Sequence, residues 1–388
     1  MPTLTPQQEL LIQKARDFVQ TELLPLEAQV EKDGGLSPEI SARITRKSRE
    51  IGLFASNIDE RFGGGGLSAL DNVLVQEQLG ATKEILARRA AGNIYECLIE
   101  GTVHQIESFL IPSIRGERFS ALAVSEPEAG SDAASIQTRA EKTQTGWILH
   151  GKKHFISDAE NCDYFIVAAV TAPNLGPRGI SLFLVEKDMK GFSLGKRFNM
   201  LGFKGTSHCE LIFDNIVLGQ DALLGQENEG FRMLGDTLGK ARLAKVGARA
   251  IGKCQRLLHL MRDHARDRQQ FGKAIIDYGP INQMIADSAI EIAAARALVL
   301  QTARDIDAGM NCREAISQVK VLTTETLGRV ADRAVQVFGA RGCHDDHVIE
   351  SFYRDARLYR IIDGTSEIHR NIIVKEHKKP GTLCPVAC

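Results

Sequence analysis

The sequence predicts an α+β chain in three parts: an α-helical N-terminal domain, a β-barrel-like middle domain and an antiparallel helical bundle at the C-terminal end. Apolar residues recur at helical spacing as far as about residue 117 and again from about residue 228. Between these positions, short runs rich in β-branched and aromatic residues alternate with turn residues, which is typical of a barrel or sandwich. We therefore expect domains at residues 1–117, 118–227 and 228–378, followed by a tail at 379–388.

Charge and composition exclude several classes of protein. The chain has 388 residues, of which 48 are Lys or Arg and 49 are Asp or Glu, so its net charge of −1 gives no electrostatic basis for binding nucleic acid or an acidic membrane surface. No window approaches the roughly eighteen uninterrupted apolar residues of a membrane span, and the N-terminus lacks the basic start and apolar core of a secretory signal. The eight cysteines include no Cys-x-x-Cys pair, and Cys343-His-Asp-Asp-His347 has no second cluster to complete a metal site. We expect a cytoplasmic protein with reduced thiols and no metal.

The N-terminal domain begins with a helix-capping sequence. In Thr5-Pro-Gln-Gln8, a cap residue, a proline at the first helical position and a glutamine at the third form a capping box. Apolar residues at 11, 15, 18 and 19 then predict an amphipathic helix. Further helices follow, with a break at the four consecutive glycines 63–66, which we interpret as a flexible connector rather than a close approach of backbones.

Strands are predicted in the middle domain from apolar and β-branched runs. They lie at residues 119–124, 147–150, 164–171, 180–186, 210–213 and 216–218. Turn signals separate them, for example Thr143-Gln-Thr-Gly146 and Phe213-Asp-Asn215. In the C-terminal part, apolar faces within 281–292 and 316–337 predict long antiparallel helices joined by short loops.

The first predicted strand leads into a polar loop that is a candidate ligand site. Pro127 stops regular strand pairing, and the loop from Ser125 to Asp132 holds three carboxylates, two hydroxyls and Gly130. Backbone N–H groups and hydroxyls can converge on a ligand there, because glycine leaves room. Ser, Asp, Pro and Gly are also ordinary turn formers, so the loop on its own favours a structural turn.

Three further stretches combine residues that suit a cofactor site. Phe155 and Ser157 fall on one face of a predicted strand, where they either border a planar cofactor or belong to an ordinary half-buried strand. Arg268 ends a predicted helix, where it either favours the helix C-terminus or holds a phosphate. Asp363 precedes a helix as a turn former, with Ser366 as the helix cap, unless this stretch has a chemical role.

Together these stretches make the sequence resemble the flavin-dependent acyl-CoA dehydrogenase family. The resemblance rests on eight motifs that occur in the family's order and cover nearly the whole chain. They are Ala123-Val-Ser-Glu-Pro-Glu-Ala-Gly-Ser-Asp-Ala-Ala-Ser135, Lys153-His-Phe-Ile-Ser157, Leu201-Gly-Phe203, Leu224-Gly-Gln-Glu-Asn-Glu-Gly-Phe231, Arg268-Gln-Gln-Phe-Gly272, Gln336-Val-Phe-Gly339, Arg354-Asp-Ala356 and Asp363-Gly-Thr-Ser366. The family implies a helical domain, a β domain and a four-helix bundle, assembled as a homotetramer with FAD between the β domain and the bundle.

The resemblance also implies roles for individual residues. Near the flavin it places Val124, Ser125, Ser131, Phe155, Ser157 and Thr365. At the diphosphate and adenosine end of an FAD bound to a neighbouring subunit it places Arg268, Phe271, Gln336 and Gly339. Near the substrate it places Ser131, Arg242 and Gly364.

The activity that the resemblance implies is FAD-dependent α,β-dehydrogenation of an acyl thioester carried by CoA or by an acyl-carrier protein. A carboxylate removes the α-proton, and the β-hydrogen leaves as hydride to flavin N5. Hydrogen bonds to the thioester carbonyl stabilise the negative charge that develops there. An electron-transfer flavoprotein would then accept the electrons.

The catalytic base is where the sequence departs most from the family. Asp363 replaces the usual glutamate, and the alternative family position for a base is Ala241, which has no carboxylate. Because aspartate is one methylene shorter, its carboxylate lies about 1 Å farther from the α-carbon, a displacement that can lower the rate about a hundredfold. Asp363 remains the predicted base, with the substrate or the backbone shifted to meet it.

Two other functions and one question of substrate stay open from the sequence. A flavin oxidase on the same scaffold is one alternative, since the similar nitroalkane oxidase uses aspartate as its base. An FAD-binding subunit with weak catalysis is the other alternative, because the glutamate is missing. Lys83, Arg88 and Arg89 lie near helix positions that form the floor of the acyl pocket in relatives, where a cation would suit a short or carboxylated chain. A solvated helix face is the alternative interpretation for at least two of the three.

Overall fold

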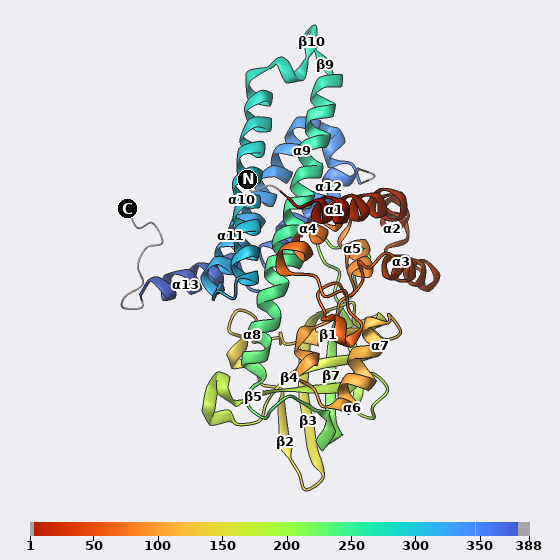
Figure 1. The fold of residues 1–388 in the computed structure, drawn as a ribbon, viewed down its shortest axis with the longest axis vertical. Helices are drawn as coiled ribbons and strands as arrows, with labels where there is room; N and C mark the ends of the chain where they lie inside the picture. Colours follow the sequence, from red (N-terminus) through yellow and green to blue (C-terminus); the bar gives the residue numbers. More distant parts are fainter. Residues whose placement is uncertain (1–3, 346, 379–388) are drawn as a thin grey trace.

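The computed structural model describes residues 4–345 and 347–378 and confirms the predicted fold class. An α-helical N-terminal domain, a middle domain built on a β-sheet and a C-terminal helical domain follow one another along the chain (Figure 1). The predicted tail, residues 379–388, lies outside the described residues. The boundaries after residues 117 and 227 stay predictions.

The N-terminal helices pack around a small apolar core. They are α1 (Pro6–Phe18), α2 (Glu27–Asp33), α3 (Pro38–Glu50), α4 (Ala69–Leu79), α5 (Glu84–Ala91), α6 (Val103–Gln105) and α7 (Ile111–Ile114). The predicted capping box is confirmed, because the Thr5 hydroxyl accepts the Gln8 N–H (3.2 Å) and the Gln8 side chain accepts the Thr5 N–H (3.1 Å). Leu23, Val30 and Leu79 are fully buried in this core.

The four glycines that follow the short 3₁₀ turn η3 (Glu60–Phe62) and precede α4 are a place of close backbone approach. A Cβ at Gly64 would lie 2.1 Å from the carbonyl oxygen of Ile58, and one at Gly65 would lie 2.9 Å from the Cα of Ser56. The backbone N–H of Gly65 also donates to the carbonyl of Ala55 (3.1 Å). The interpretation of this run as a flexible connector is therefore wrong, since only glycine fits these contacts.

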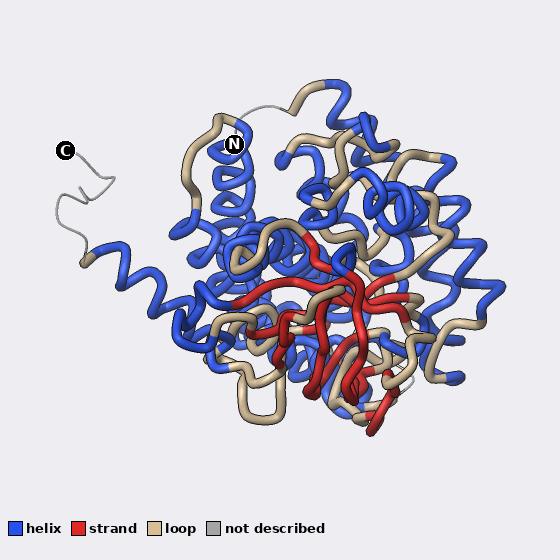
Figure 2. The backbone as a smooth tube through the Cα atoms, turned by 90° about the horizontal axis from the view of Figure 1, so that it is seen from below, coloured by secondary structure: helices blue, strands red, loops and turns tan. Residues whose placement is uncertain are grey.

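The middle domain is an eight-stranded mixed sheet. Its strands are β1 (Ser120–Ala123), β2 (Arg139–Lys142), β3 (Gly146–Ser157), β4 (Tyr164–Val170), β5 (Ile180–Glu186), β6 (Phe192–Arg197), β7 (His208–Gly219) and β8 (Leu223–Leu224). The order is β6-β7-β3-β2-β4-β5-β8, with β1 beside β4. The β1–β4 and β2–β4 pairs are parallel, which the antiparallel prediction missed. In Figure 2 the strands face the viewer, with helices around and behind them.

Strand β7 joins two runs that the sequence predicts as separate strands. Phe213 pairs with Gly151 and Ile216 with Leu149, so both runs belong to one strand that pairs with β3. Asn215 has a φ of 51°, a left-handed conformation that turn formers tolerate. The predicted turn is therefore an irregularity within the strand, where the register shifts.

The C-terminal domain is organised around one long helix (Figure 1). α8 (Gly230–Ala241) continues through a π-helical segment (Arg242–Ala248) into α9 (Arg249–Asp267). A hairpin of β9 (Gln269–Gln270) and β10 (Lys273–Ala274) follows, and then α10 (Gly279–Asp307), α11 (Arg313–Phe338), α12 (Val348–Tyr359) and α13 (Ser366–His377). π-Helical turns are rare and often occur at functional sites, which directs attention to residues 242–248.

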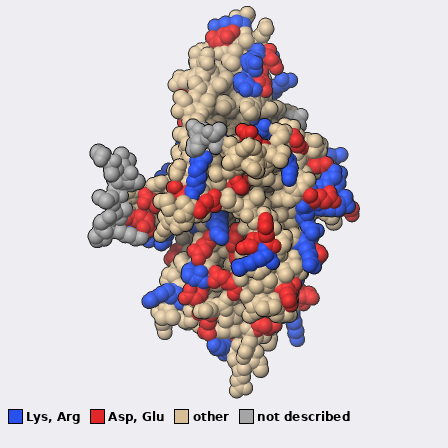
Figure 3. All heavy atoms as spheres, in the orientation of Figure 1, with Lys and Arg blue, Asp and Glu red and all other residues tan. Residues whose placement is uncertain are grey.

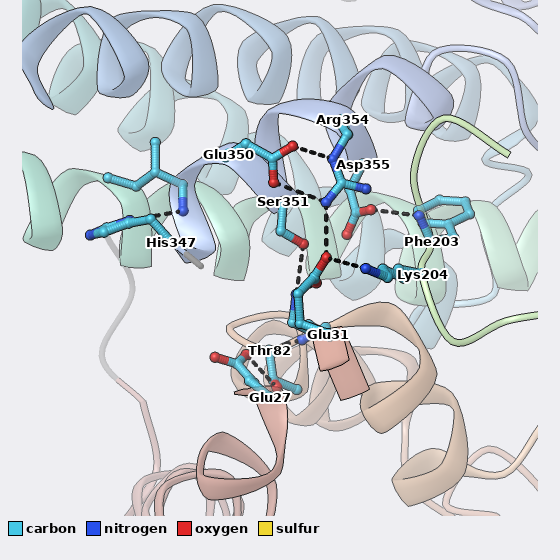
Figure 4. A network of polar contacts seen from close by, with 12 residues as sticks. Glu27, Glu31, Thr82, Phe203, Lys204, His347, Glu350, Ser351, Arg354 and Asp355 are labelled. Carbon is cyan, nitrogen blue, oxygen red and sulfur yellow. Dashed lines mark hydrogen bonds and ion pairs between the residues drawn. The ribbon is translucent and has the colours of Figure 1, made fainter. Parts of the chain in front are cut away.

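A partly buried ionic network joins the three domains (Figure 4). Glu31 of α2 pairs with Lys204, from the loop between β6 and β7 (3.0 Å), and with Arg354 of α12 (3.2 Å). Lys83 donates to Glu31 (2.5 Å) and to the Ser351 hydroxyl of α12 (2.8 Å). These contacts fix the sheet and the N-terminal helices against the bundle.

The surface carries charges of both signs. On the face shown in Figure 3, Lys and Arg side chains are interspersed with Asp and Glu rather than gathered in a field of one sign. Across the described residues, no helix is long and apolar enough to cross a membrane. No group of three or more His, Cys, Asp or Glu side chains in the same residues could hold a metal ion.

Candidate active site

The polar loop after β1 is fixed to strand β3 by hydrogen bonds. The backbone N–H of His154 donates to the carbonyl of Ser125 over 2.8 Å. The Lys153 ammonium donates to the carbonyl of Val124 (3.0 Å) and to the carboxylate of Glu126 (2.7 Å). The structure therefore brings the first residues of the predicted loop site beside the strand that carries Phe155 and Ser157.

Glu126 anchors this loop and is not a free carboxylate. Its oxygens also accept the backbone N–H groups of Gln137 (2.6 Å) and Thr138 (3.0 Å). Burial opposes its ionisation, but the Lys153 charge and these hydrogen bonds hold the pKa of Glu126 below its ordinary value. Burial lowers the pKa of Lys153 to about 8, although the Glu126 charge opposes that shift. Of the carboxylates in the loop, Glu126 thus has a structural role.

Phe155 lies at a bulge in β3. The pairing with β7 shifts between Lys153 and Ile156, and Phe155 has a φ of 57°. The strict alternation assumed from the sequence therefore does not hold through these residues. The Phe155 ring is 50% exposed and lies 4.6 Å from the ring centre of Phe198.

The surroundings of Phe155 fit a flavin. The bulge turns a flat aromatic surface outward beside the loop, where a planar ring system can cover it. At the open end of the loop, Gly130 and Ser131 are exposed, and a Cβ at Gly130 would meet no atom within 4 Å. An exposed aromatic ring beside a loop with room for a ligand is compatible with the flat ring system of a flavin.

Asp363 is held in place through its own backbone. Its carbonyl oxygen accepts hydrogen bonds from Arg242 Nε (2.7 Å) and His369 Nε2 (3.2 Å). Its φ of 52° lies in the left-handed region, which costs a non-glycine residue on the order of 1 kcal/mol, so these bonds stabilise a strained conformation. Within residues 4–345 and 347–378, no hydrogen bond reaches its carboxylate. The side chain is therefore available for chemistry while the backbone is fixed.

Three cations lie within electrostatic reach of Asp363. Arg242 and Lys245 are on the π-helical segment, and Lys320 is on α11. Burial lowers the pKa of Arg242, and it lowers the pKa values of Lys245 and Lys320 to about 8; the Asp363 charge opposes each shift. Asp363 thus supplies negative charge to a group of cations that burial alone would tend to discharge.

The residues after Asp363 form a tight turn into α13. Gly364 has a φ of 97°, and a Cβ there would lie 3.0 Å from His369 Nε2, so both conformation and space favour glycine. Among the described residues, none accepts a hydrogen bond from the Gly364 N–H. The cap of α13 is Thr365, whose hydroxyl accepts the Ile368 N–H (3.3 Å). The prediction of Ser366 as the cap is therefore wrong by one residue.

His369 makes the support of Asp363 sensitive to acid. Burial, together with the Arg242 charge, lowers the pKa of His369 to about 4. In the unfolded chain the His369 imidazole takes up a proton near pH 6.5, whereas in the folded chain it does so only near pH 4. The contribution of neutral His369 to the free energy of unfolding is therefore fully present above pH 6.5 and is lost as the pH falls toward 4. We expect this residue to contribute up to about 3 kcal/mol of that loss. Thermal midpoints between pH 7 and pH 4.5 should therefore fall less steeply in His369→Gln, and parallel curves for both proteins would contradict the assignment.

The residues predicted for the adenosine end of FAD gather at the far end of the bundle. Arg268 follows α9, Phe271 lies in the β9–β10 hairpin, and Gln336 and Gly339 lie where α11 ends. His264 stacks on Phe338, with ring centres 4.1 Å apart, which holds the two helix ends together. Phe271 is 95% exposed.

Within one chain, the residues predicted for the adenosine end of FAD lie far from the residues predicted for the flavin. The helix from Arg242 to Arg268 rises about 1.5 Å per residue, which places its ends roughly 35–40 Å apart. Figure 1 shows the β9–β10 hairpin at the top of the molecule and the sheet at the bottom. A single chain therefore does not bring Arg268 to Phe155.

The three cations predicted near the acyl end have different surroundings. Lys83 and Arg89 are buried in ion pairs, the first with Glu31 and the second with Asp158 (2.9 Å). The alternative interpretation, a solvated helix face, is therefore wrong for Lys83 and Arg89, because both form ion pairs inside the protein. Arg88 is partly buried, and its Nε is buried with no hydrogen-bond partner among the described residues.

Lys245 is a residue near the site that the sequence interpretation missed. It lies three positions after Arg242, and the Asp363 charge acts on it. The available signal is a lysine inside the otherwise apolar run Leu243–Ala248. A charge in such a run is unusual unless it has a partner or a ligand.

Family models match almost the whole chain. The models described as acyl-CoA dehydrogenase N-terminal, middle and C-terminal domain match residues 5–117, 121–216 and 228–377. Among curated relatives, acryloyl-CoA reductase (NADH) of Anaerotignum propionicum is 35% identical over 97% of this chain and 96% of its own. Acyl-CoA dehydrogenase of Bacillus subtilis is 33% identical over 96% and 98%. The caffeyl-CoA reductase-Etf complex subunit CarC of Acetobacterium woodii is 32% identical over 95% and 97%.

Solved structures show the same fold over the whole chain. Butyryl-CoA dehydrogenase from Megasphaera elsdenii has a TM-score of 0.89 at 28% identity, covering 97% of this chain and 99% of its own. The FAD complex of PigA has a TM-score of 0.90 at 27% identity, covering 97% and 98%. The chain therefore belongs to the acyl-CoA dehydrogenase family, and it is an FAD-dependent oxidoreductase that dehydrogenates the acyl group of acyl-CoA.

Proposed function

We propose that Asp363 is the base that removes the α-proton of the acyl-CoA thioester. The observation that carries this proposal is that the backbone of Asp363 is hydrogen-bonded whereas its side chain is not. The backbone carbonyl of Asp363 is held by Arg242 and His369, while the carboxylate has no hydrogen bond in the described part of the chain. A catalytic base must be fixed in position and free to accept a proton, and this arrangement provides both.

The neighbouring groups complete the proton transfer. The Gly364 N–H, which is unpaired among the described residues, can donate to the thioester carbonyl and stabilise the negative charge that develops as the α-proton moves to Asp363. Arg242 fixes the peptide unit between Asp363 and Gly364. The Asp363 carboxylate and the Gly364 N–H therefore keep fixed positions relative to each other. When bound, FAD supplies the acceptor for the hydride that leaves the β-carbon. Contacts of Ser131 and Arg242 with the substrate itself stay predictions.

Exchange of the α-hydrogen in D₂O tests this role without requiring dehydrogenation. A 3-thia-acyl-CoA has sulfur in place of the β-carbon, so it can lose an α-proton but has no β-hydrogen to transfer. We expect the holoenzyme to introduce deuterium at the α-carbon, and we expect Asp363→Asn to reduce the exchange to the rate in buffer. Equal exchange by both proteins would remove Asp363 from the mechanism.

We further propose that FAD is bound between two copies of the chain. Val124, Ser125, Ser131, Phe155, Ser157 and Thr365 of one copy would contact the flavin side. Arg268, Phe271, Gln336 and Gly339 of a second copy would contact the diphosphate and adenosine. Two facts support this: the long separation of the two groups within one chain, and the nearly complete exposure of Phe271. A homotetramer agrees with such shared sites.

Arg268→Ala is expected to weaken FAD binding about 10- to 100-fold, because a charge-assisted hydrogen bond to phosphate is lost. The change is measured as the dissociation constant of FAD from the reconstituted protein, with the oligomeric state followed by light scattering. Arg266→Ala is the matched control, since Arg266 is also exposed near the end of the same helix. Unchanged FAD affinity with an intact oligomer would contradict the assignment.

An electron-transfer flavoprotein is the proposed electron acceptor. The relative named as a subunit of a caffeyl-CoA reductase-Etf complex supports this, because its name joins a chain of this family to such a flavoprotein. Reduction of a purified electron-transfer flavoprotein that depends on both enzyme and acyl-CoA is the expected result. Rapid reoxidation of the reduced enzyme by oxygen, at a rate that exceeds this transfer, would favour an oxidase instead. The cytoplasmic location stays a prediction.

A further inference from the structure

The loop that carries Asp363 is closed at a single backbone carbonyl. The carbonyl oxygen of Arg360 accepts the N–H of Ser366, the first residue of α13, over 3.0 Å. The same oxygen accepts a hydrogen bond from the ammonium of Lys320, on α11, over 3.1 Å. Residues 360–366 therefore form a loop whose two ends meet at one atom, and Asp363 lies in the middle of that loop.

Lys320 is fully buried, and stability alone does not account for it. In the described part of the chain its ammonium makes no other hydrogen bond and no ion pair. Burial lowers the pKa of Lys320 to about 8, although the charges of Asp363, Glu325 and Glu367 oppose that shift. A buried ammonium with one neutral acceptor is unfavourable for folding, so an apolar side chain of similar length should be at least as stable there.

Ser317 lies one helical turn before Lys320 and reaches the same loop through His369. Its hydroxyl oxygen lies 3.1 Å from His369 Nδ1, and His369 Nε2 lies 3.2 Å from the carbonyl oxygen of Asp363. Because a carbonyl only accepts, Nε2 carries the proton, and Nδ1 of the neutral ring is an acceptor. The carbonyl of Arg313, 3.2 Å from the same hydroxyl, is the alternative acceptor, but Nδ1 would then lack a donor in a fully buried site. Ser317 therefore donates to the ring that holds Asp363.

The short side chain of aspartate makes the position of this backbone important. Fewer torsions separate the carboxylate of aspartate from its backbone than in glutamate, so the Asp363 carboxylate follows the loop closely. The φ of 52° at Asp363 is a strained conformation that persists only where the surroundings hold it. A base displaced by about 1 Å can lose roughly a hundredfold in rate. The contacts that hold the loop therefore set how well the base is aligned.

We propose that Lys320 and Ser317 are positioning residues for the base. Helix α11 holds the loop of residues 360–366 at two points, which are the Arg360 carbonyl and, through His369, the Asp363 carbonyl. This inference rests on the proposed function, because it requires that Asp363 takes up the α-proton. Its consequence is that both residues affect the rate of proton removal and leave the affinity for the thioester unchanged.

Exchange of the α-hydrogen in D₂O, measured beside analogue affinity on the holoenzyme, tests this consequence. The probes are 3-thiabutanoyl-CoA, 3-thiaoctanoyl-CoA and 3-thiaglutaryl-CoA, and the one that the wild type exchanges fastest is used for the variants. We expect Lys320→Met and Ser317→Ala each to slow the exchange about 10-fold, with the dissociation constant of the analogue within about twofold of wild type. Lys320→Met should keep FAD and melt at or above the wild-type temperature.

Two further variants separate positioning from a general effect of removing a buried polar group. Ser317→Thr keeps the hydroxyl, so it should recover most of the exchange rate. Thr324→Val is the matched control, because it removes a buried hydroxyl of α11 that bonds only to carbonyls of its own helix. Its exchange rate should equal that of the wild type. An equal loss in Thr324→Val and Ser317→Ala overturns the inference.

Combination with Asp363→Asn shows whether Lys320 acts through the base. In the Asp363→Asn background there is no carboxylate to position, so Lys320→Met should change the residual rate of flavin reduction by less than about twofold. The same substitution should slow reduction about 10-fold in the wild-type background. Equal slowing in both backgrounds overturns the inference.

The exchange experiment also distinguishes failure of this inference from failure of the proposed function. Exchange that is lost in Asp363→Asn but normal in Lys320→Met and Ser317→Ala overturns the inference and leaves Asp363 as the base. Equal exchange by wild type and Asp363→Asn removes the base and the inference with it. Weaker analogue binding in place of slower exchange would mean contact with the substrate and overturns positioning. If Lys320→Met loses FAD, Ser317→Ala decides, since slow exchange that Ser317→Thr recovers supports the inference and normal exchange overturns it.

Discussion

Asp363→Asn is expected to lower the rate of flavin reduction by acyl-CoA about 100- to 10,000-fold, because the amide cannot accept the α-proton. The backbone bonds from Arg242 and His369 end on the carbonyl of residue 363, so the substitution leaves them intact. The fold and the FAD content should therefore be retained. Anaerobic rapid mixing, with the flavin absorbance band as the signal, measures the effect.

Asp363→Glu is the matched variant for this experiment, since it keeps the charge and adds the methylene that most of the family has. We expect it to retain reduction within roughly 100-fold of wild type, the size of effect that a displacement of about 1 Å can produce. A fast Asp363→Asn would contradict the role of the carboxylate. An Asp363→Glu variant as slow as Asp363→Asn would show that position, and not charge alone, limits the step.

Arg242→Met is expected to slow flavin reduction about 10- to 100-fold with little change in the affinity for a 3-thia-acyl-CoA. Arg242 donates to the carbonyl of Asp363 over 2.7 Å, so its loss releases the peptide unit that carries both the base and the Gly364 N–H. Arg242 is in this respect a positioning residue. The rate constant for reduction and the dissociation constant of the analogue are measured separately.

Partial rescue distinguishes this role from a simple loss of stability. Arg242→Lys keeps a donor at this position, so it should recover part of the reduction rate, and both variants should retain FAD. A lower affinity with an unchanged rate of reduction would indicate instead that Arg242 binds the substrate directly. Equal loss of FAD and activity would point to unfolding of the site.

The three-part fold could be predicted from the sequence because it depends on local patterns. Helical spacing, the capping box at Thr5 and the short β-rich runs each report on a few neighbouring residues. Bulges do not follow from such patterns. The shift between Lys153 and Ile156 and the left-handed residue at Asn215 depend on how β3 and β7 pair across the sheet.

Contacts between distant segments explain the remaining differences. The glycines at 63–66 are needed because the backbone of residues 55–58 approaches them, which the run of glycines alone does not show. The partners of Lys83 and Arg89 come from elements elsewhere in the chain.

The positions of the motif residues could be predicted only in part. The loop from Val124 and the strand at Phe155 come together because His154 and Lys153 bond the loop carbonyls. The Asp363 turn lies against the π-helical segment through Arg242. That segment interrupts a helix whose sequence shows ordinary α-helical periodicity. Its wider π-helical turns could therefore not be predicted from the sequence.

Anaerobic addition of short, branched and carboxylated acyl-CoAs to the purified FAD-containing protein is the most direct test of the central claim. The flavin absorbance band reports whether the acyl group is dehydrogenated. We predict that at least one of these thioesters bleaches the band in the wild type, and that none does so at a comparable rate in Asp363→Asn. A fully FAD-loaded wild-type protein that no acyl-CoA bleaches would contradict the account.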